Sequence, residues 1–155
     1  MFRTYTVSTN AVVGAAAMDL ALIIGAAGKV CRVIRLECSA TDAAAPTSGE
    51  MNFRCRYLSA TVTPGSGGTT PTPSRMIQGD AAASFTAHAN DTSGATSSGS
   101  VVVLWSGAAH VLTGLDYMFP EPPTVNVSTA VTFELLTLPS GTIHLDMCVT
   151  VEEIG

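Results

Sequence analysis

The sequence predicts an all-β fold of one domain, with about seven to nine strands and little helix. Three observations predict this fold class. Apolar and polar residues alternate with a period of two in several segments, clusters of Gly, Pro, Ser and Thr separate those segments, and no segment has a persuasive helical period. A sheet with this many strands must pair with another or close on itself to cover its edges, so we expect a β-sandwich, a jelly roll or a barrel.

Length and composition agree with a single folded domain over residues 1–155. A chain in which 46% of the residues are hydrophobic is too apolar to remain disordered. At this size, folding buries roughly 70% of the surface that the unfolded chain exposes, which is enough for a core without support from disulfides or metals. The sequence contains no internal repeat and no heptad pattern.

The N-terminal region offers weaker signals. Residues 2–8 alternate weakly and lie at the terminus, so we interpret residues 1–10 as an edge strand or an arm. The Ala-rich segment 15–24 is the best helix candidate in the chain. Gly14 and Gly25 bracket it, however, and it could equally be a bent strand.

An apolar stretch at residues 11–28 raises the question of a signal peptide or a membrane anchor. Asp19 stands in the middle of this stretch, and an Asp at the centre of a bilayer costs roughly 2.5–3.5 kcal/mol. The segment before it has one cation, Arg3, and its pattern is that of a strand rather than of a basic leader. We therefore expect no membrane association.

Five further strands are expected along the rest of the chain. Residues 51–57 and 143–151 alternate most cleanly, each with one apolar and one polar face, as in a half-buried strand. Residues 30–38 form a strand interrupted by charged residues, and residues 132–138 form another that a Pro-Ser-Gly turn stops. Residues 101–105 are a continuous apolar run, which suits a strand covered on both sides.

Two long polar connections, near residues 63–80 and 90–100, lie between these strands. Loops longer than about 12–15 residues in a compact domain are usually functional or mobile. The first connection carries Arg75, Met76 and Ile77 in otherwise polar surroundings, which indicates a contact with another molecule. The alternative is that Met76 and Ile77 fold back onto their own sheet.

The chain carries little charge for its size. Only 12% of its residues are charged and Lys29 is its single lysine, whereas an ordinary soluble domain has about 25% charged residues. Such a surface is only weakly protected against association with other subunits. The arginines are singly spaced and the net charge is −5, so we expect no nucleic-acid partner, because binding to phosphates needs several cations.

Residue types that serve catalysis or metal binding are present but scattered. His88, His110 and His144 fall on separate expected strands or strand ends, and no two of the four cysteines have the Cys-x-x-Cys spacing of a zinc site. Asp116 and Glu121 flank a Pro-rich segment that favours a loop over a carboxylate pair. No Ser occupies the Gly-x-Ser-x-Gly turn of a hydrolase. We expect no enzymatic activity, catalytic residue, metal or cofactor.

Several short motifs follow one another in a recognisable order. They are Ala17-Met18-Asp19-Leu20, the strands at 30–38 and 52–57, Gly65-Ser66-Gly67-Gly68, Thr70-Pro71-Thr72-Pro73, Gly79-Asp80-Ala81-Ala82, Asn90-Asp91-Thr92, Glu121-Pro122-Pro123 and Glu152-Glu153-Ile154-Gly155. In this order they resemble small virion structural proteins of tailed bacteriophages and related prophages. The resemblance spans most of the chain.

The resemblance implies a non-enzymatic virion protein, assembled in the host cytoplasm. It implies a capsid decoration or cement subunit that binds across copies of the major capsid protein. Copies of the chain would associate with closed symmetry, and a trimer would suit threefold positions of an icosahedral lattice. From the N-terminal segment and the first long loop, we expect the contacts to involve Phe2, Arg3, Tyr5, Arg75, Met76 and Ile77.

One alternative function rests on the aromatic residues. Trp105, the only tryptophan, ends the apolar run, and we expect it to be buried. If its ring were exposed beside Tyr117 and Phe119, it could stack on a sugar. The chain would then be a tail or spike module that binds a host-surface glycan.

Overall fold

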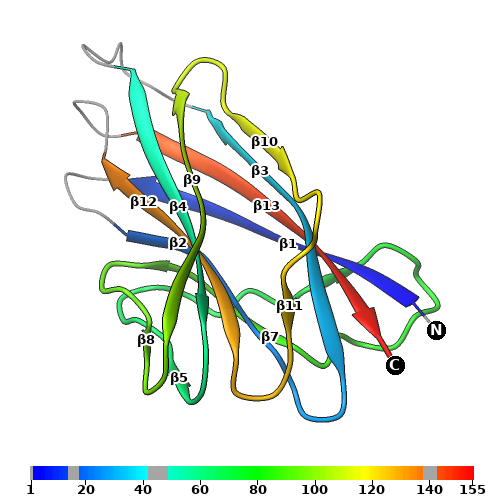
Figure 1. Ribbon diagram of the computed structural model, residues 1–155. Coiled ribbons are helices and arrows are strands. Elements are labelled where there is room, and N and C mark those ends of the chain that lie inside the picture. The colour runs from blue at the N-terminus through cyan, green and yellow to red at the C-terminus, as the bar shows by residue number, and fades with distance from the viewer. Residues whose placement is uncertain (1, 14–17, 42–48, 138–142) are drawn as a thin grey trace.

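Two antiparallel sheets face one another in a computed structural model of the chain, which describes residues 2–13, 18–41, 49–137 and 143–155 (Figure 1). One sheet, here called sheet A, contains five strands in spatial order and a sixth segment, β11, which pairs with β3. In that order its strands are β10 (Leu115–Met118), β3 (Val30–Ala40), β13 (Ile143–Ile154), β1 (Phe2–Val13) and β6 (Ser74–Arg75), with β11 (Thr124–Val125) beside β10.

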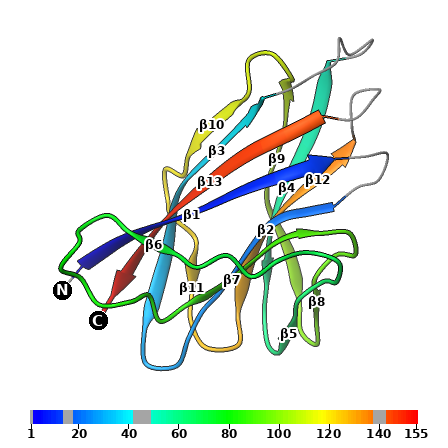
Figure 2. The same ribbon diagram turned by 180° about the vertical axis from the view of Figure 1, so that it is seen from behind.

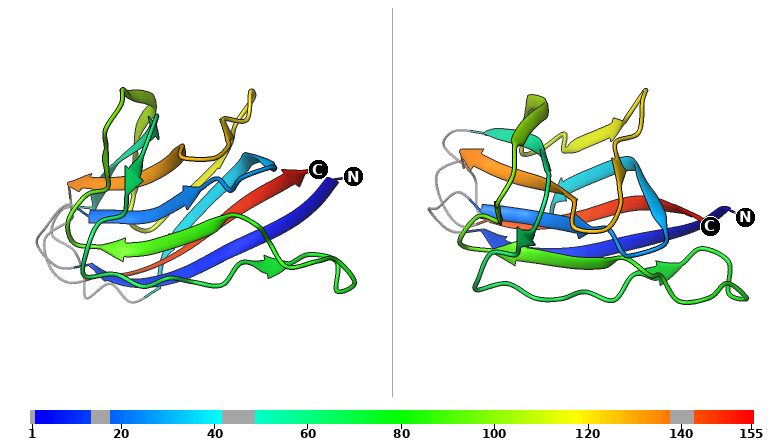
Figure 3. Two further views of the ribbon diagram at one scale, coloured as in Figure 1. Left: turned by 90° about the horizontal axis from the view of Figure 1, so that it is seen from below. Right: turned by 60° about the horizontal axis from the view of Figure 1, so that its bottom comes forward.

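The opposing sheet, here called sheet B, has five strands, and a small two-stranded ladder stands apart from both sheets. The order in sheet B is β7 (Thr86–Asp91), β2 (Met18–Ile24), β12 (Ala130–Thr137), β4 (Glu50–Leu58) and β9 (Val101–His110). The separate ladder pairs β5 (Val62–Thr63) with β8 (Thr96–Ser97). Figure 3 shows sheets A and B as two layers.

This architecture confirms the predicted all-β sandwich. The described residues contain thirteen strands and no helix. Four of the thirteen are only two residues long, and the remaining nine fall within the seven to nine that the sequence predicts. The two-residue strands lie within or beside the connections that the sequence marks as loops, because backbone pairing over so short a length leaves no periodicity to detect.

Strands β1 and β13 join the two ends of the chain. They pair over the whole of β1, from Phe2 opposite Ile154 to Val13 opposite Ile143, so the termini lie side by side (Figure 2). Among the described residues, β1 pairs on its other edge only with β6, at Tyr5 and Thr6. Of the two interpretations of residues 1–10, an edge strand or an arm, residues 2–10 form a strand, which β6 covers at Tyr5 and Thr6, and residue 1 lies outside the described residues.

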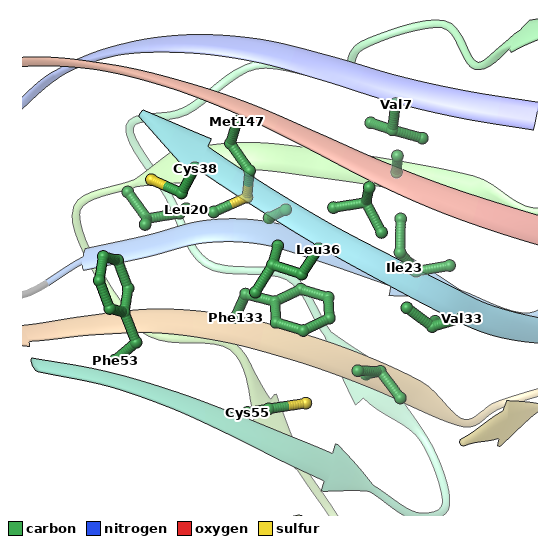
Figure 4. Close-up of a cluster of buried hydrophobic side chains, with 14 of the residues drawn as sticks. Val7, Leu20, Ile23, Val33, Leu36, Cys38, Phe53, Cys55, Phe133 and Met147 are labelled. Carbon is green, nitrogen blue, oxygen red and sulfur yellow. The ribbon is translucent and has the colours of Figure 1, made fainter. Parts of the chain in front are cut away.

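The core fills the space between the sheets (Figure 4). Every second residue of β13 is buried, as its strict alternation predicts, and β4 shows the same pattern from Glu50 to Arg56 on the opposing sheet. The largest fully buried side chains include Phe133, Leu36, Met51, Leu135, Ile143 and Leu145.

Strand β2 is covered on both faces, and β9 is not. All residues of β2 except Ile24 are buried. On its outer face, Leu22 packs with Leu58, Ala95 and Ala130 in a second small cluster. The described part of the segment 15–24 is therefore a strand and not a helix, and residues 14–17 lie outside the described residues. In contrast, β9 is an edge strand, so the prediction that residues 101–105 are covered on both sides is wrong.

Side chains link the two layers at both sides of the sandwich. At one side the Asn90 amide in β7 donates a hydrogen bond to the Asn10 carbonyl oxygen in β1, at 2.9 Å. At the other side Trp105 of β9 stacks on Tyr117 of β10, with ring centroids 4.7 Å apart. The second side carries the edge strand β9.

Candidate interaction surfaces

The N-terminal strand and the first long loop, which the sequence singles out separately, are neighbours in the structure. Tyr5 pairs with Arg75 across β1 and β6, and the Met76 amide donates to the Thr4 carbonyl oxygen at 3.0 Å. Three large apolar side chains of this region are exposed by 62–63%. We call them the N-terminal surface: Phe2, Met76 and Ile77.

A fixed turn holds the loop part of the N-terminal surface. The Asp80 amide donates to the Ile77 carbonyl oxygen at 3.0 Å, which closes the turn. Farther along, the Ser84 amide and hydroxyl both donate to the buried Glu153 carboxylate, the amide at 2.8 Å. Met76 and Ile77 therefore point outward from an anchored segment, and the alternative that they fold back onto their own sheet does not hold.

The other three expected contact residues differ from one another in how far they are exposed. Tyr5 has no exposed surface: its hydroxyl donates to the Ala81 carbonyl oxygen at 3.0 Å, and its ring meets Phe85 edge to face. Burial raises the pKa of Tyr5 above its ordinary value. Arg3 is half-buried and Arg75 is exposed. Tyr5 thus belongs to the core and anchors the loop from beneath, a role that its place in a weakly alternating strand did not reveal.

A second apolar surface lies along β9. Leu104 forms a bulge in this strand, because Trp105 pairs with Cys55 and Val103 pairs with Arg56. The bulge and the edge position leave four consecutive apolar side chains exposed by 42–52%. We call them the β9 edge: Val101, Val102, Val103 and Leu104.

An aromatic column closes the sandwich next to the β9 edge. Trp105 stacks on Tyr117, Tyr117 meets Phe119 edge to face at 4.9 Å, and Phe119 lies 6.2 Å from Phe133 in the core. Gly107 makes room for this column, because a Cβ atom there would collide with the Trp105 indole. Trp105 is half-buried, whereas the sequence predicts a buried residue.

A cleft of about 400 Å³ opens beside the column. Its walls are apolar and aromatic, and Glu121 contributes one carboxylate. Asp116, which the sequence places near Glu121, points elsewhere: both its oxygens accept hydrogen bonds from Arg35, at 2.6 and 2.8 Å. This hydrogen bonding lowers the pKa of Asp116. The two carboxylates do not form a pair. The remaining residues of the cleft are Leu104, Tyr117, Phe119, Pro120 and Pro123.

A wider groove of about 670 Å³ lies on the outer face of sheet A. Residues of β1, β3 and β13 line most of it, among them Asn10, Glu37 and Asp146. The Asn10 amide donates to the Asp146 carboxylate, and the Ser8 hydroxyl donates to the half-buried thiol of Cys148. These groups satisfy one another across neighbouring strands, as cross-strand pairs commonly do.

The outer face of sheet B carries a buried ionic cluster. Arg54 and Arg56 of β4 both bind the Glu134 carboxylate, with 2.6 Å between the Arg54 Nε and the carboxylate oxygen. Asp19 lies directly across from Glu134 in the next strand and accepts the Ala95 amide at 2.6 Å. Burial raises the pKa of Asp19 to about 6, from an ordinary value of 3.8.

The residue types suited to catalysis stay dispersed in the structure. His88, His110 and His144 lie on β7, β9 and β13. Over the described ranges, no group of three or more His, Cys, Asp or Glu side chains is placed to hold a metal ion. Cys31, Cys38 and Cys55 are buried free thiols, and burial raises the pKa of each to about 12.

Comparison with known protein families finds no family that matches the chain, and comparison with curated proteins finds no match. In the part of the chain that the structure describes, no helix has the length and apolar character needed to cross a bilayer.

Proposed function

We propose that this chain is a non-enzymatic structural subunit of a bacteriophage virion, one that decorates the capsid and binds across copies of the major capsid protein. The observation that carries the proposal is the N-terminal surface. Phe2, Met76 and Ile77 are large, apolar and mostly exposed, and the turn that presents two of them is anchored to β1 and β13. An exposed apolar cluster on a rigid support is typical of a binding surface.

The proposed mechanism is mechanical. Complete burial of a Phe, Met or Ile side chain stabilises a complex by about 1.5–3 kcal/mol, so each subunit contact is modest. Repetition over a capsid lattice turns modest contacts into strong attachment. With 12% charged residues, docking removes few ions from water, and desolvation of ions is costly. On the capsid, a trimer at threefold lattice positions fits this arrangement, with its copies brought together by the major capsid protein.

The first test is the composition of the particle. We expect the protein in purified virions of its phage, at a copy number tied to that of the major capsid protein. Quantitative mass spectrometry of gradient-purified particles measures both. Absence of the chain from purified particles would refute the proposed function.

A double variant tests the N-terminal surface itself. Met76→Ser with Ile77→Ser keeps β6 and the turn but removes two apolar contacts, so we expect at least a tenfold loss of affinity for undecorated capsids in a sedimentation binding assay. Leu112→Ser is the matched control. Leu112 is 79% exposed and lies in the turn between β9 and β10. That turn is at the top of Figure 1, away from the N-terminus. Equal binding of the double variant and the wild type would count against this surface.

The cleft beside the aromatic column favours one alternative function. An apolar cleft of about 400 Å³ with tyrosine and phenylalanine in its walls and one carboxylate, Glu121, could hold a sugar ring of a host-surface glycan. In that case the chain would be a tail or spike module. Glycan-array binding that Glu121→Gln abolishes would support this alternative, and no binding to any glycan or host envelope would remove it.

A further inference from the structure

Natural β-proteins protect their sheet edges, and three of the four edges in this sandwich follow that rule. Beside β1, the edge strand β6 is two residues long and carries Arg75. Beside β3, the edge is formed by the short strands β10 and β11, and β10 carries Asp116. The edge of β7 is covered by the preceding loop, because Thr69 and Ala89 exchange both backbone hydrogen bonds, at 2.8 and 2.9 Å.

The fourth edge, β9, lacks these protections. It is ten residues long, and within the described residues it has no partner on its outer side. No Asp, Glu, Lys, Arg or Pro occurs between Asp91 and Asp116. Of the protective features, the strand has only the bulge at Leu104. The four residues of the β9 edge are apolar on both faces of the sheet. A long, uncharged, apolar edge is a template for pairing with another strand.

We infer that the β9 edge pairs in antiparallel fashion with the β9 edge of a second copy of this chain. A twofold axis through the strand sets valines against valines, so no like charges meet. The nearest charge on the neighbouring strand is Arg56, opposite Val103, and Glu134 already neutralises it. A partner with a charged strand would find no counter-charge here. The self-complementary apolar strand is therefore the occupant that this edge fits best.

The size of the edge sets the strength of the pairing. Four side chains that are about half exposed offer a few hundred Å² per copy, less than the roughly 800 Å² per partner of a standard interface. Main-chain hydrogen bonds between the strands must supply part of the affinity. The dimer is accordingly weak, with dissociation in the micromolar range or above. This contact joins copies of the chain to each other and goes beyond the proposed attachment to a capsid.

The test uses the purified chain alone, so its result does not depend on capsid binding. Sedimentation equilibrium from low micromolar to millimolar concentration should show a shift from one 15.9 kDa chain toward twice that mass. Val103→Lys should leave the chain monomeric, because pairing would bring two lysines onto an uncharged edge, close to each other beside the twofold axis. Ile77→Lys, on the N-terminal surface, is the matched control and should dimerise like the wild type.

Hydrogen exchange on the wild type provides a second measurement that needs no variant. Backbone amides of residues 101–110 should exchange more slowly as concentration rises, while those of β7 should not change. A chain that stays monomeric at every concentration would overturn the inference. So would a dimer or trimer that persists in Val103→Lys, or an association in which exchange within β9 does not slow.

Discussion

The carboxyl group of Asp19 is buried in surroundings that disfavour its charged form. Asp19 is the second residue of the buried strand β2 and is 2% exposed, with Glu134 directly across from it on β12. Its carboxylate accepts the Ala95 amide, which connects β2 to the segment leading into β8. Removal from water disfavours the charged form more than this hydrogen bond and Arg56 favour it, so the pKa of Asp19 rises to about 6.

This pKa predicts how stability depends on pH. Because the folded pKa of about 6 lies above the ordinary 3.8, the folded chain holds the Asp19 proton more tightly than the unfolded chain between these values. The contribution of Asp19 to stability is complete below about pH 4 and is lost as pH rises through 6, a loss of about 3 kcal/mol. Asp19→Asn keeps an acceptor for Ala95 and has no such loss.

Guanidinium unfolding at pH 4 and pH 7 measures the effect. Between pH 4 and pH 7, the unfolding free energy of Asp19→Asn should rise relative to that of the wild type by up to about 3 kcal/mol. The other titrating groups are shared by both proteins and largely cancel. Parallel pH profiles for the two proteins would contradict the prediction.

At the scale of elements, the connection from β6 to β7 behaves as a clamped segment rather than a free loop. Tyr5 holds it at Ala81 and Glu153 holds it at Ser84, both from the strand pair that joins the chain termini. Glu153 is 2% exposed, and its carboxylate accepts two hydrogen bonds from a single residue. The position of the N-terminal surface therefore depends on side chains that lie in the core.

Glu153→Gln should loosen this clamp. The substitution replaces an acceptor that is bonded twice, and hydrogen bonds to a buried charged group are worth about 1.5–3 kcal/mol each, so we expect a loss of unfolding free energy of about 1–3 kcal/mol. Limited proteolysis should then cut within residues 76–83. Glu152→Gln is the control, because Glu152 forms a partly exposed ion pair with Arg32 that should contribute less than about 1 kcal/mol. Equal proteolysis of both variants would show that Glu153 is not the anchor.

For strands with one solvent-exposed face, the sequence predicted which side is buried. For strands with two similar faces, it did not predict the place in the sheet. The alternation of β4 and β13 identifies both the strand and its buried side. The run at residues 101–104 is apolar throughout, yet it lies at an edge, while β2 with its Asp19 is covered on both faces. An apolar run indicates a strand but carries no information about its place in the sheet, because that place depends on pairings distant in sequence.

The candidate surface was predictable in part for the same reason. Met76 and Ile77 stand out because they are apolar within a polar loop, and their exposure agrees with that signal. Tyr5 shares the weak pattern of its strand, and nothing in that pattern separates it from exposed Phe2. The contact that decides its role joins Tyr5 to Ala81, 76 residues away. Local patterns do not record such contacts.

For the whole molecule, the last strand completes the fold. β13 lies between β3 and β1 in the middle of sheet A, so both halves of that sheet lack a partner until residues 143–154 are in place. Its inward side chains also supply part of the core that faces sheet B. Folding therefore has to wait for pairings between the two ends of the chain, which is typical of slowly folding β-proteins.

A chain that ends at residue 140 should not fold, because β1 would lose its full-length neighbour and the core would lose Leu145 and Val149. We expect no cooperative unfolding transition and no near-ultraviolet circular dichroism from Trp105. Adding a peptide of residues 143–155 should restore both signals, since it can insert between β3 and β1. A chain that ends at residue 153 keeps nearly all of this pairing and should unfold cooperatively. Cooperative unfolding of the chain that ends at 140, without the peptide, would show that sheet B and the remaining strands hold the fold on their own.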